Sequence, residues 1–406
     1  MPLPAEWIGA AEAAQRLGVK QASLYSYVSR GVLTSRKAQG SRTSLFSATE
    51  VEGLARRGRP RRAPGAAELV IETELTEITG DHLRYRGRDA IGLARARSFE
   101  EVAGLLWTGS LDEPGESWQA TEAAVAAGSA AQAALPAGTL PLERLQVIVP
   151  ALAAADPLRL HLDTPAVIAA GRCLIAGMAD CLPAVRNGDT ATGSTIAERL
   201  VPRLCPADPG PGLVGALRAA LVLLADHELA ASTLAARVAA SVRADPYAVV
   251  ATGLGAVGGA LHGGASFGAE VMLRSAARPA EAGRVVGDLL RRGERIPGFG
   301  HFVYRGRDPR AAALMDLLRE AAPRSERLAV ADAVIAEVRR RALPEPNIDF
   351  ALAVLATTGG MIPGAGEAVF AVARAAGWLA HALEEYARNV PIRPRGIYTG
   401  PAEVPL

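Results

Sequence analysis

Residues 366–389 read GEAVFAVARAAGWLAHALEEYARN, a run in which apolar side chains recur at helical spacing. Alanine and leucine dominate this run, and both residue types favour helix. The same pattern recurs along most of the chain, so we predict a main body that is mostly α-helical. The other clear helical segments are residues 98–108, 166–182, 213–225 and 230–242.

The composition of the 406 residues supports a large helical core. Half of the residues are hydrophobic but only 4% are aromatic, a balance that favours closely packed helices over an all-β fold. Beyond residue 66 there is no alternation of strands with helices and no glycine-rich phosphate loop, and only Val70–Leu75 is predicted as a strand.

The sequence also suggests where the protein works. No secretion signal opens the chain, and the apolar run 213–225 contains Arg218 and is too short to span a membrane. Three cysteines, an odd number in apolar contexts, are expected to be reduced thiols. We therefore expect a cytoplasmic protein without membrane contact. The cysteines are Cys173, Cys181 and Cys205.

Charge is distributed unevenly along the chain. The whole protein has 44 basic and 42 acidic side chains, a net charge of +2, but residues 1–62 hold 11 basic and 4 acidic ones and so carry +7. The remainder therefore carries −5. A basic run rich in Pro and Gly, RRGRPRRAPG at residues 56–65, marks the boundary. We infer a small basic module followed by a large, mildly acidic one.

The basic module has the order helix, glycine turn, helix. Residues 10–17 and 21–30 are predicted helices separated by Gly18, and a Gly-Ser turn at residues 40–41 separates two strand-like pieces. These features resemble the winged helix-turn-helix head of MerR-type and excisionase-type regulators, which implies that residues 1–62 bind DNA. A vestigial or protein-contacting module is the alternative.

Three histidines and one aspartate stand in frames that suit catalysis. His227 lies in ADHELAAS, His262 in GALHGGA and His301 in PGFGHFVYRGRDPR; flanking glycines let the backbone approach a ligand closely. Asp349 lies among apolar residues in PNIDF, where burial would raise its pKa and suit it to act as a base. Taken singly, each residue is more often structural. No HxxxH or CxxC spacing is present, so no metal site is predicted.

Together and in this order, these frames resemble the citrate synthase family over residues 76–400. The resemblance implies a helical fold of two domains: a large domain formed by residues 66–263 and 360–406, and a small domain formed by residues 264–359 that closes over the substrates. The motifs that carry it are LRYRG (83–87), SFEEV (98–102), LLADHELAASTLAARVAAS (223–241), GALHGGA (259–265), PGFGHFVYRGRDPR (297–310), PNIDFALA (346–353), AVARAAGWLAHALEE (371–385) and IRPRGIYTG (392–400).

The resemblance also implies a reaction, in which acetyl-CoA condenses with oxaloacetate through an enol intermediate and citryl-CoA is hydrolysed to citrate and CoA. Asp349 would remove a methyl proton, His262 would donate a hydrogen bond to the thioester oxygen, and His301 would polarise the ketone of oxaloacetate. A weakly acidic proton requires this combination of a base with a donor to the enolate oxygen. No cofactor is implied beyond the co-substrate acetyl-CoA.

The same resemblance implies the residues that bind the substrates. The two carboxylates of oxaloacetate suit arginine, and the family's positions fall on His227, Arg310, Arg374 and Arg393. Arg393 would reach the active site of the neighbouring subunit, so that a homodimer would be required for activity. Arg305 matches a position that binds the phosphates of CoA.

Other functions stay open at this stage. One is 2-methylcitrate synthesis from propionyl-CoA, because one methylene in an apolar pocket contributes only about 1–3 kcal/mol to selectivity. Another is a DNA-binding regulator that uses the synthase fold as a metabolite sensor. An inactive regulator would be expected to lose Asp349 or His301 first, and both are present. A symmetric dimer with paired heads would combine both functions.

Overall fold

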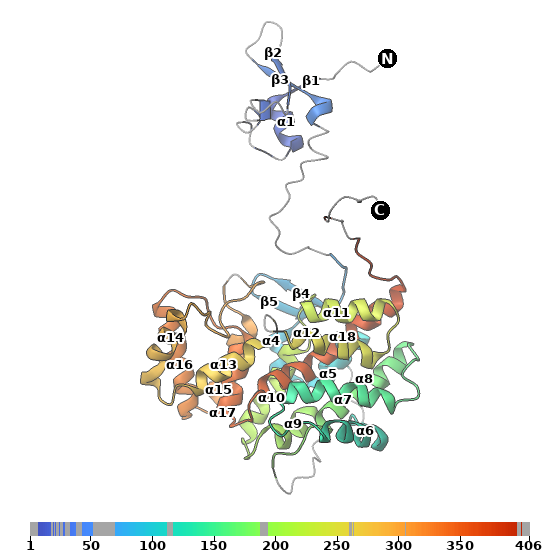
Figure 1. Ribbon diagram of the computed structural model, residues 1–406, viewed down its shortest axis with the longest axis vertical. Helices are drawn as coiled ribbons and strands as arrows, with labels where there is room; N and C mark the ends of the chain where they lie inside the picture. Colours follow the sequence, from blue (N-terminus) through green and yellow to red (C-terminus); the bar gives the residue numbers. More distant parts are fainter. Residues whose placement is uncertain are drawn as a thin grey trace, which may run out of the picture. The chain divides into compact units, whose positions relative to one another are not determined.

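The computed structural model divides the chain into two compact units, Met1–Glu72 and Thr73–Leu406 (Figure 1). Arg305, the linker at 56–65 and most of the predicted helix at 21–30 lie outside the residues that it describes. The described residues are 7–17, 19, 21, 24, 27–28, 33–37, 43–51, 70–111, 117–186, 194–259, 262, 264–304, 306–395 and 399.

The first unit contains an antiparallel sheet of three short strands in the order β1-β3-β2. Strand β3 (Ser44–Ser47) pairs with β1 (Trp7–Gly9) and with β2 (Ser35–Lys37). Helix α1 (Ala10–Leu17) packs against β1 and β3. The predicted first helix and the two strand-like pieces are therefore present. That this unit is a helix-turn-helix head stays a prediction.

The second unit begins with an antiparallel sheet in the order β4-β5-β6. Its strands are β4 (Thr76–Thr79), β5 (His82–Tyr85) and β6 (Arg88–Asp89). The strand predicted at Val70–Leu75 is wrong. The first strand starts at Thr76 because Gly80, with a φ of +61°, closes the tight turn that pairs β4 with β5.

Helices make up most of the second unit, as predicted. The five predicted segments are confirmed as α5, α8, α10, α11 and α18, each end within two residues of its prediction. The helices are α4 (Ala90–Ala96), α5 (Phe99–Thr108), α6 (Glu122–Ala133), α7 (Pro141–Ala154), α8 (Thr164–Asp180), α9 (Ile196–Leu204), α10 (Pro211–Leu224), α11 (Ala231–Ser241), α12 (Pro246–Val257), α13 (Gly264–Arg274), α14 (Ala282–Arg291), α15 (Pro309–Ala321), α16 (Glu326–Arg340), α17 (Ile348–Thr358) and α18 (Ala365–Arg388), with a 3₁₀ turn at Pro279–Glu281.

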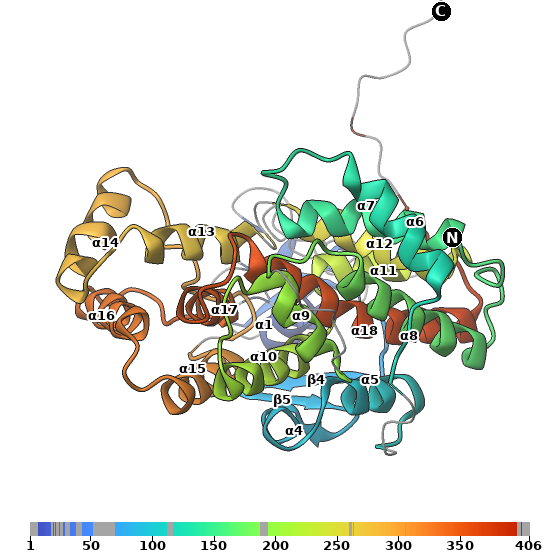
Figure 2. The ribbon, with the colours of Figure 1, turned by 90° about the horizontal axis from the view of Figure 1, so that it is seen from below.

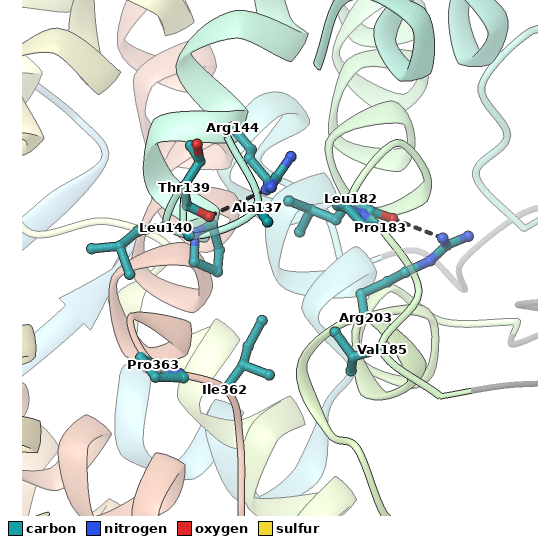
Figure 3. A pocket seen from close by; sticks show the side chains of 12 residues that line it. Ala137, Thr139, Leu140, Arg144, Leu182, Pro183, Val185, Arg203, Ile362 and Pro363 are labelled. Atoms are coloured by element: carbon teal, nitrogen blue, oxygen red, sulfur yellow. Dashed lines mark hydrogen bonds between the residues drawn. The ribbon is translucent and has the colours of Figure 1, made fainter. Parts of the chain in front are cut away.

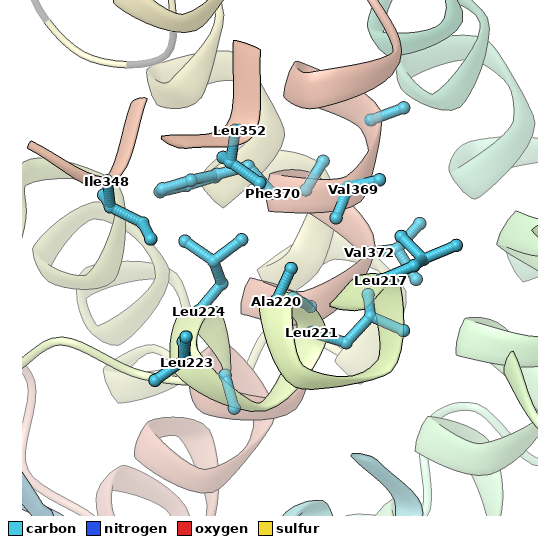
Figure 4. Packing of buried hydrophobic residues seen from close by; sticks show 14 of the residues in the cluster. Leu217, Ala220, Leu221, Leu223, Leu224, Ile348, Leu352, Val369, Phe370 and Val372 are labelled. Atoms are coloured by element: carbon cyan, nitrogen blue, oxygen red, sulfur yellow. The ribbon is translucent and has the colours of Figure 1, made fainter. Parts of the chain in front are cut away.

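Helix α18 forms the centre of this unit. Every residue from Ala365 to Ala382 is buried, as expected for a helix that is apolar on all sides. Figure 4 shows the leucines of α10 meeting apolar side chains of α17 and α18. The contact between α18 and the end of α10 requires glycine at position 377, because a Cβ there would lie 2.3 Å from the carbonyl oxygen of Ala225.

Helices α13 to α17 lie together on one side of the second unit (Figure 2). Helix α13 packs on α17, and α14 packs on α16. These helices span the segment predicted as the small domain, residues 264–359, and α17 also contacts α10 and α18. The division into a large and a small domain stays a prediction. In the described part of the chain, no helix is long and apolar enough to cross a membrane.

Candidate active site

Two helix caps bring the predicted residues of the loop 297–310 to the start of α17. Asn347 caps α17: its Oδ1 accepts hydrogen bonds from the backbone N–H of Asp349 (3.0 Å) and of Phe350 (3.3 Å). Its Nδ2 donates to the carbonyl oxygen of Gly300 at 2.8 Å, and its backbone N–H donates to that of Gly298 at 2.9 Å. The loop that carries His301 is therefore fixed to the first turn of α17.

The second cap, Asp308, holds Arg310. Both residues are almost fully buried, at 2% exposed. The Asp308 carboxylate caps α15 and accepts from Nε (3.0 Å) and Nη2 (2.8 Å) of Arg310, and it also accepts from the backbone N–H of Ile348 at 3.0 Å. Although burial alone would raise the pKa of Asp308, the charge of Arg310 and its hydrogen bonds keep it lowered. One buried carboxylate thus joins the start of α15 to the start of α17.

His301 is a neutral imidazole with its proton on Nε2. Its Nδ1 accepts hydrogen bonds from the backbone N–H groups of Val303 (3.0 Å) and Tyr304 (3.2 Å), so we assign the ring proton to Nε2. Burial and the nearby charge of Arg310 lower the pKa of His301 to about 4. Nε2 lies 3.3 Å from Nη2 of Arg310. Two N–H groups converge at this point, which suits an oxygen of an anionic ligand.

His262 is also neutral, with the opposite tautomer. Its Nε2 lies 2.8 Å from the hydroxyl oxygen of Ser232 and accepts from the backbone N–H of Ser232 at 3.4 Å. The ring proton is therefore on Nδ1. Burial, together with the charge of Arg374, lowers the pKa of His262 to about 4. His262 and His301 each present one N–H donor whose direction is set by the bonds at the other ring nitrogen.

His227 and Arg374 complete the group of buried cationic and imidazole side chains. The ring of His227 lies 5.3 Å from that of His301, and its Nε2 lies 3.0 Å from the hydroxyl of Tyr304. Burial, with Arg310 and Arg374, lowers the pKa of His227 well below its usual value. Arg374 donates from Nε to the carbonyl oxygen of Leu224 at 2.7 Å. Burial lowers its pKa to about 10, so it stays charged at neutral pH.

Asp349 is the carboxyl group suited to act as a base. It occupies the second position of α17 and lies close enough to Arg310 and Arg374 for their charges to lower its pKa. Burial is the stronger influence and, with the charge of Asp308, raises the pKa to about 7. A carboxyl group that titrates near neutrality can accept a proton efficiently at that pH.

The family is decided by comparison with known proteins. Residues 66–395 match the family described as citrate synthase, C-terminal domain. The chain belongs to the citrate synthase family. It is therefore an enzyme of the acyltransferase class, and the fold and order of motifs expected from the sequence are those of a citrate synthase.

Individual relatives agree with the family. The chain is 35% identical to a citrate synthase of Haloferax volcanii and 32% identical to citrate synthase 2 of Bacillus subtilis, each over 82% of this chain and 94% of the relative. It is 28% identical to 2-methylcitrate synthase of Mycobacterium tuberculosis over 84% of this chain and 91% of that protein. A solved citrate synthase of Thermoplasma acidophilum shares the fold.

 

That structure is the ternary complex with carboxymethyl coenzyme A and oxaloacetate. It matches this chain with a TM-score of 0.70 at 24% identity, over 84% of this chain and 96% of that one. At this level of identity the match shows the fold, and the helical architecture of the second unit is the architecture of a citrate synthase.

The structure brings most of the predicted site residues together. His301 contacts both His227 and Arg310. Tyr304 also contacts His227 and Arg310. Asp349 and His262 are linked to this group through the charges of Arg310 and Arg374. The exceptions are Arg393, which is exposed after the end of α18 and has no hydrogen bond or ion pair to any of them in the described residues, and Arg305, which lies outside the described residues.

Sequence reasoning missed the residues that hold the site in place. Asp308, Asn347, Ser232 and Tyr304 each contact a predicted residue directly. Asp308 and Asn347 precede helices as Asp or Asn caps commonly do, so the sequence carried a signal for their local role. It carried none for the contacts that they make across the fold.

A buried charged network was also missed. Asp226, the residue before His227, lies 3.2 Å from Nε2 of His381. Nδ1 of His381 lies 2.6 Å from Nη1 of Arg237, which is fully buried and forms an ion pair with Glu385. The spacing of His381 and Glu385 places both on one face of α18. This network fixes the loop that carries His227 to α11 and α18.

In the part of the chain that the structure describes, no group of three or more His, Cys, Asp or Glu side chains could hold a metal ion. The three cysteines are free thiols. Burial raises the pKa of Cys181 and of Cys205 to about 11, so both thiols are protonated at neutral pH and are poor nucleophiles.

Proposed function

We propose that this chain condenses acetyl-CoA with oxaloacetate and hydrolyses citryl-CoA to citrate and CoA, and that it does so in the cytoplasm. One observation carries the proposal: a carboxyl group of raised pKa, Asp349, lies in one site with two neutral histidines and two buried arginines. Forming an enol from a thioester requires a base on one side and hydrogen-bond donors on the other.

The first step is proton transfer from the methyl group of acetyl-CoA to the carboxylate of Asp349. The electron pair of the broken C–H bond moves towards the thioester carbonyl, and Nδ1–H of His262 donates a hydrogen bond to its oxygen. A neutral imidazole suits this task because its N–H can stabilise the growing negative charge, and the ring does not first have to be protonated to the imidazolium. The hydroxyl and N–H of Ser232 support this tautomer.

The second step forms the carbon–carbon bond. The enolate carbon attacks the ketone carbon of oxaloacetate, the thioester carbonyl re-forms, and Nε2–H of His301 gives its proton to the ketone oxygen. The proton that Asp349 took from the methyl group balances this loss and returns to His301 through solvent before the next cycle. Arg310, Arg374 and His227 bind the carboxylates of oxaloacetate. Water then attacks the thioester carbonyl of citryl-CoA and CoA leaves as the thiol, with Asp349 and His262 acting again in this hydrolysis.

We propose a homodimer in which Arg393 of each subunit reaches the site of the other. Large apolar side chains lie exposed after the end of α7 and at the end of α11, and an ion pair between Arg159 and Asp245 joins these two segments. They support an interface there, because such side chains seldom lie exposed together on a monomer. Arg305 is proposed to bind the phosphates of CoA. The exposed side chains are Leu158, Leu160, Val238 and Val242, which are 39% to 68% exposed.

The release of free CoA tests the function. With oxaloacetate present, we expect CoA release from acetyl-CoA, measured with a thiol reagent, and none when oxaloacetate is omitted. Propionyl-CoA is the parallel substrate, because a 2-methylcitrate synthase is among the relatives. A higher kcat/KM for propionyl-CoA would assign the chain to 2-methylcitrate synthesis. No oxaloacetate-dependent release from either thioester would refute the proposed reaction and favour the sensor function.

We propose that residues 1–62 bind DNA, as their charge of +7 suggests. A mixed-sequence duplex should be retarded by the full chain in an electrophoretic shift at low salt, and less so as salt rises. A chain that lacks residues 1–62 should not retard the duplex but should release CoA at the rate of the full chain. Equal retardation by both chains would contradict the proposal.

Gly298 offers a test of the geometry. Its φ is +79°, and a Cβ there would lie 2.9 Å from the backbone N and Cα of Phe350. We expect Gly298→Ala to lower kcat/KM for CoA release by on the order of 100-fold, because the loop must move and carries His301 away from Asp349. Gly293→Ala is the control: its φ is +73°, but no atom lies within 4 Å of the added Cβ. Equal losses in the two variants would show that backbone strain, not the contact, is responsible.

A further inference from the structure

A cavity separate from the candidate active site lies in the second unit, and none of its lining residues belongs to that site. It has a volume of about 330 Å³, which is within the range of small-molecule sites. The start of α7, the segment after α8, the end of α9 and the segment between α17 and α18 form its walls (Figure 3). Its apolar surface comes mainly from Leu140, Leu182, Val185, Ile362 and Pro363.

Two arginines line this apolar cavity. Arg144 donates to the carbonyl oxygens of Thr139 (3.2 Å) and Pro136 (3.2 Å) and to the side-chain oxygen of Gln132 (2.5 Å). Arg203 donates from Nη1 to the carbonyl oxygen of Leu182 at 2.7 Å. All of these acceptors are neutral. Within the described residues, neither arginine forms an ion pair with a carboxylate, so no side chain in that part of the chain neutralises either positive charge.

Arg203 also has an unused donor. Its Nε is buried and has no hydrogen-bond partner among the described residues. Because this Nε is closed off, a ligand in the cavity would meet the outer nitrogen Nη2 of Arg203, which makes no hydrogen bond within the described residues. Arg144 is held by several carbonyl oxygens, so its guanidinium is fixed before any ligand arrives.

We propose that this cavity binds a small carboxylate with an apolar body. The carboxylate accepts hydrogen bonds from Arg203 and is attracted by the charge of Arg144, while the apolar body packs on Leu140, Val185 and Ile362. The size of the cavity and its mainly apolar lining favour a monocarboxylate of moderate chain length. The site does not depend on the condensation reaction.

The wall formed by Ile362 and Pro363 connects the cavity to the catalytic residues through the chain. These residues connect α17, which carries Asp349, to α18, which carries Arg374. The connection is held by a hydrogen bond from the N–H of Ile362 to the carbonyl oxygen of Leu204 at 2.8 Å. A bound carboxylate would therefore slow hydrogen exchange at Ile362.

Calorimetric titration of the full chain with octanoate tests the site, with octanamide as the uncharged analogue. We expect saturable binding of octanoate at millimolar concentration or below, and binding of octanamide weaker by about tenfold or more, as the loss of a charge-assisted hydrogen bond predicts. Hydrogen exchange measured by mass spectrometry should slow in the peptide that contains Ile362. No saturable binding of octanoate, or equal binding of octanamide, would overturn the proposal.

Two variants separate the charge from the cavity. Arg203→Gln should weaken octanoate binding by about tenfold or more while leaving octanamide binding unchanged. Val185→Phe should weaken the binding of both, because it fills the cavity. Arg172→Gln, at an exposed position of α8, removes the same charge outside the cavity and should bind octanoate as the wild type does. All three should release CoA at the wild-type rate without octanoate, which shows that they fold. Unchanged octanoate binding by Arg203→Gln would contradict the proposed role of that residue.

Discussion

Replacing Asp349 by asparagine should lower kcat for CoA release by about 10²–10⁴-fold, the usual contribution of a general base. Asparagine keeps the size of the side chain and its place in the first turn of α17, but it cannot accept the methyl proton. The KM values for oxaloacetate and acetyl-CoA should change much less than kcat, since Asp349 is proposed to act on the reacting carbon rather than to bind the substrates. Steady-state kinetics with both substrates varied would measure this.

The pH dependence gives an independent test of the same residue. Since burial raises the pKa of Asp349 to about 7, the wild-type kcat/KM should rise with pH up to about 7 and then level off. His262 and His301, with pKa values of about 4, stay neutral over this range and should not contribute. A midpoint near the ordinary pKa of an aspartate, about 4, would contradict the assignment.

The stability of the Asp349→Asn variant should separate catalysis from folding. Because the pKa is higher in the folded state than in the unfolded state, the folded protein binds more protons between about pH 4 and pH 7. Asp349 therefore contributes stability at low pH that is lost as the pH rises through this window. Asparagine carries no charge, so at about pH 8 the variant should melt at or above the wild-type Tm. Asp332→Asn, on the exposed side of α16, should leave both kcat and Tm unchanged.

Replacing Asp308 by asparagine should have the largest effect on stability, a loss of about 3–5 kcal/mol in the free energy of unfolding. The carboxylate is buried and pairs with the buried guanidinium of Arg310. Removing its charge leaves Arg310 without a counter-charge in the interior. Chemical denaturation followed by circular dichroism would measure the loss. Asp316→Asn on the same helix, where the ion pair with Arg319 is about half exposed, should change stability by less than about 1 kcal/mol.

The same variant should also change the kinetics. Arg310 would lose its counter-charge and one of the two hydrogen bonds that orient it, because the amide nitrogen of asparagine cannot accept, so the KM for oxaloacetate should rise by about tenfold or more. The negative charge of Asp308 helps to raise the pKa of Asp349, so the pH midpoint of kcat/KM should move to lower pH. A purely structural role would lower stability without moving this midpoint. An unchanged midpoint would therefore limit Asp308 to a structural role.

The chemical groups of the site could be predicted from the sequence, but their supports could not. His262 and His301 are flanked by glycines, which let the backbone approach a ligand, and Asp349 is flanked by apolar residues, which predict its burial. These signals lie next to the residues in the chain, so the sequence shows them. Asp308 lies in the same motif as His301, residues 297–310. Nothing in that motif shows that its carboxylate also accepts from the N–H of Ile348, which lies 40 residues further along the chain. The link from His381 to Asp226 spans an even larger separation.

Local patterns determined the helices, because hydrophobic spacing and caps act within a few residues. Ser98 and Glu101 mark the start of α5 by hydrogen bonds to each other's backbone, and the apolar run that forms α18 is buried on every side. Charge counting separated the basic first unit from the larger second one. Residues Val70–Leu75 were misjudged because strand formation requires a partner, and the partner β5 pairs only from Thr76 onward.

Tertiary structure decided the protonation states. Histidine alone has an ordinary pKa near 6.5, and only burial, the backbone donors to His301 and the contact of Ser232 with His262 make both rings neutral with opposite tautomers. The raised pKa of Asp349 likewise depends on what surrounds it. The sequence by itself determined which groups the protein has and which helices precede or follow them in the chain. Their charges and directions depend on desolvation and on neighbours distant in the chain, which exist only in the folded protein.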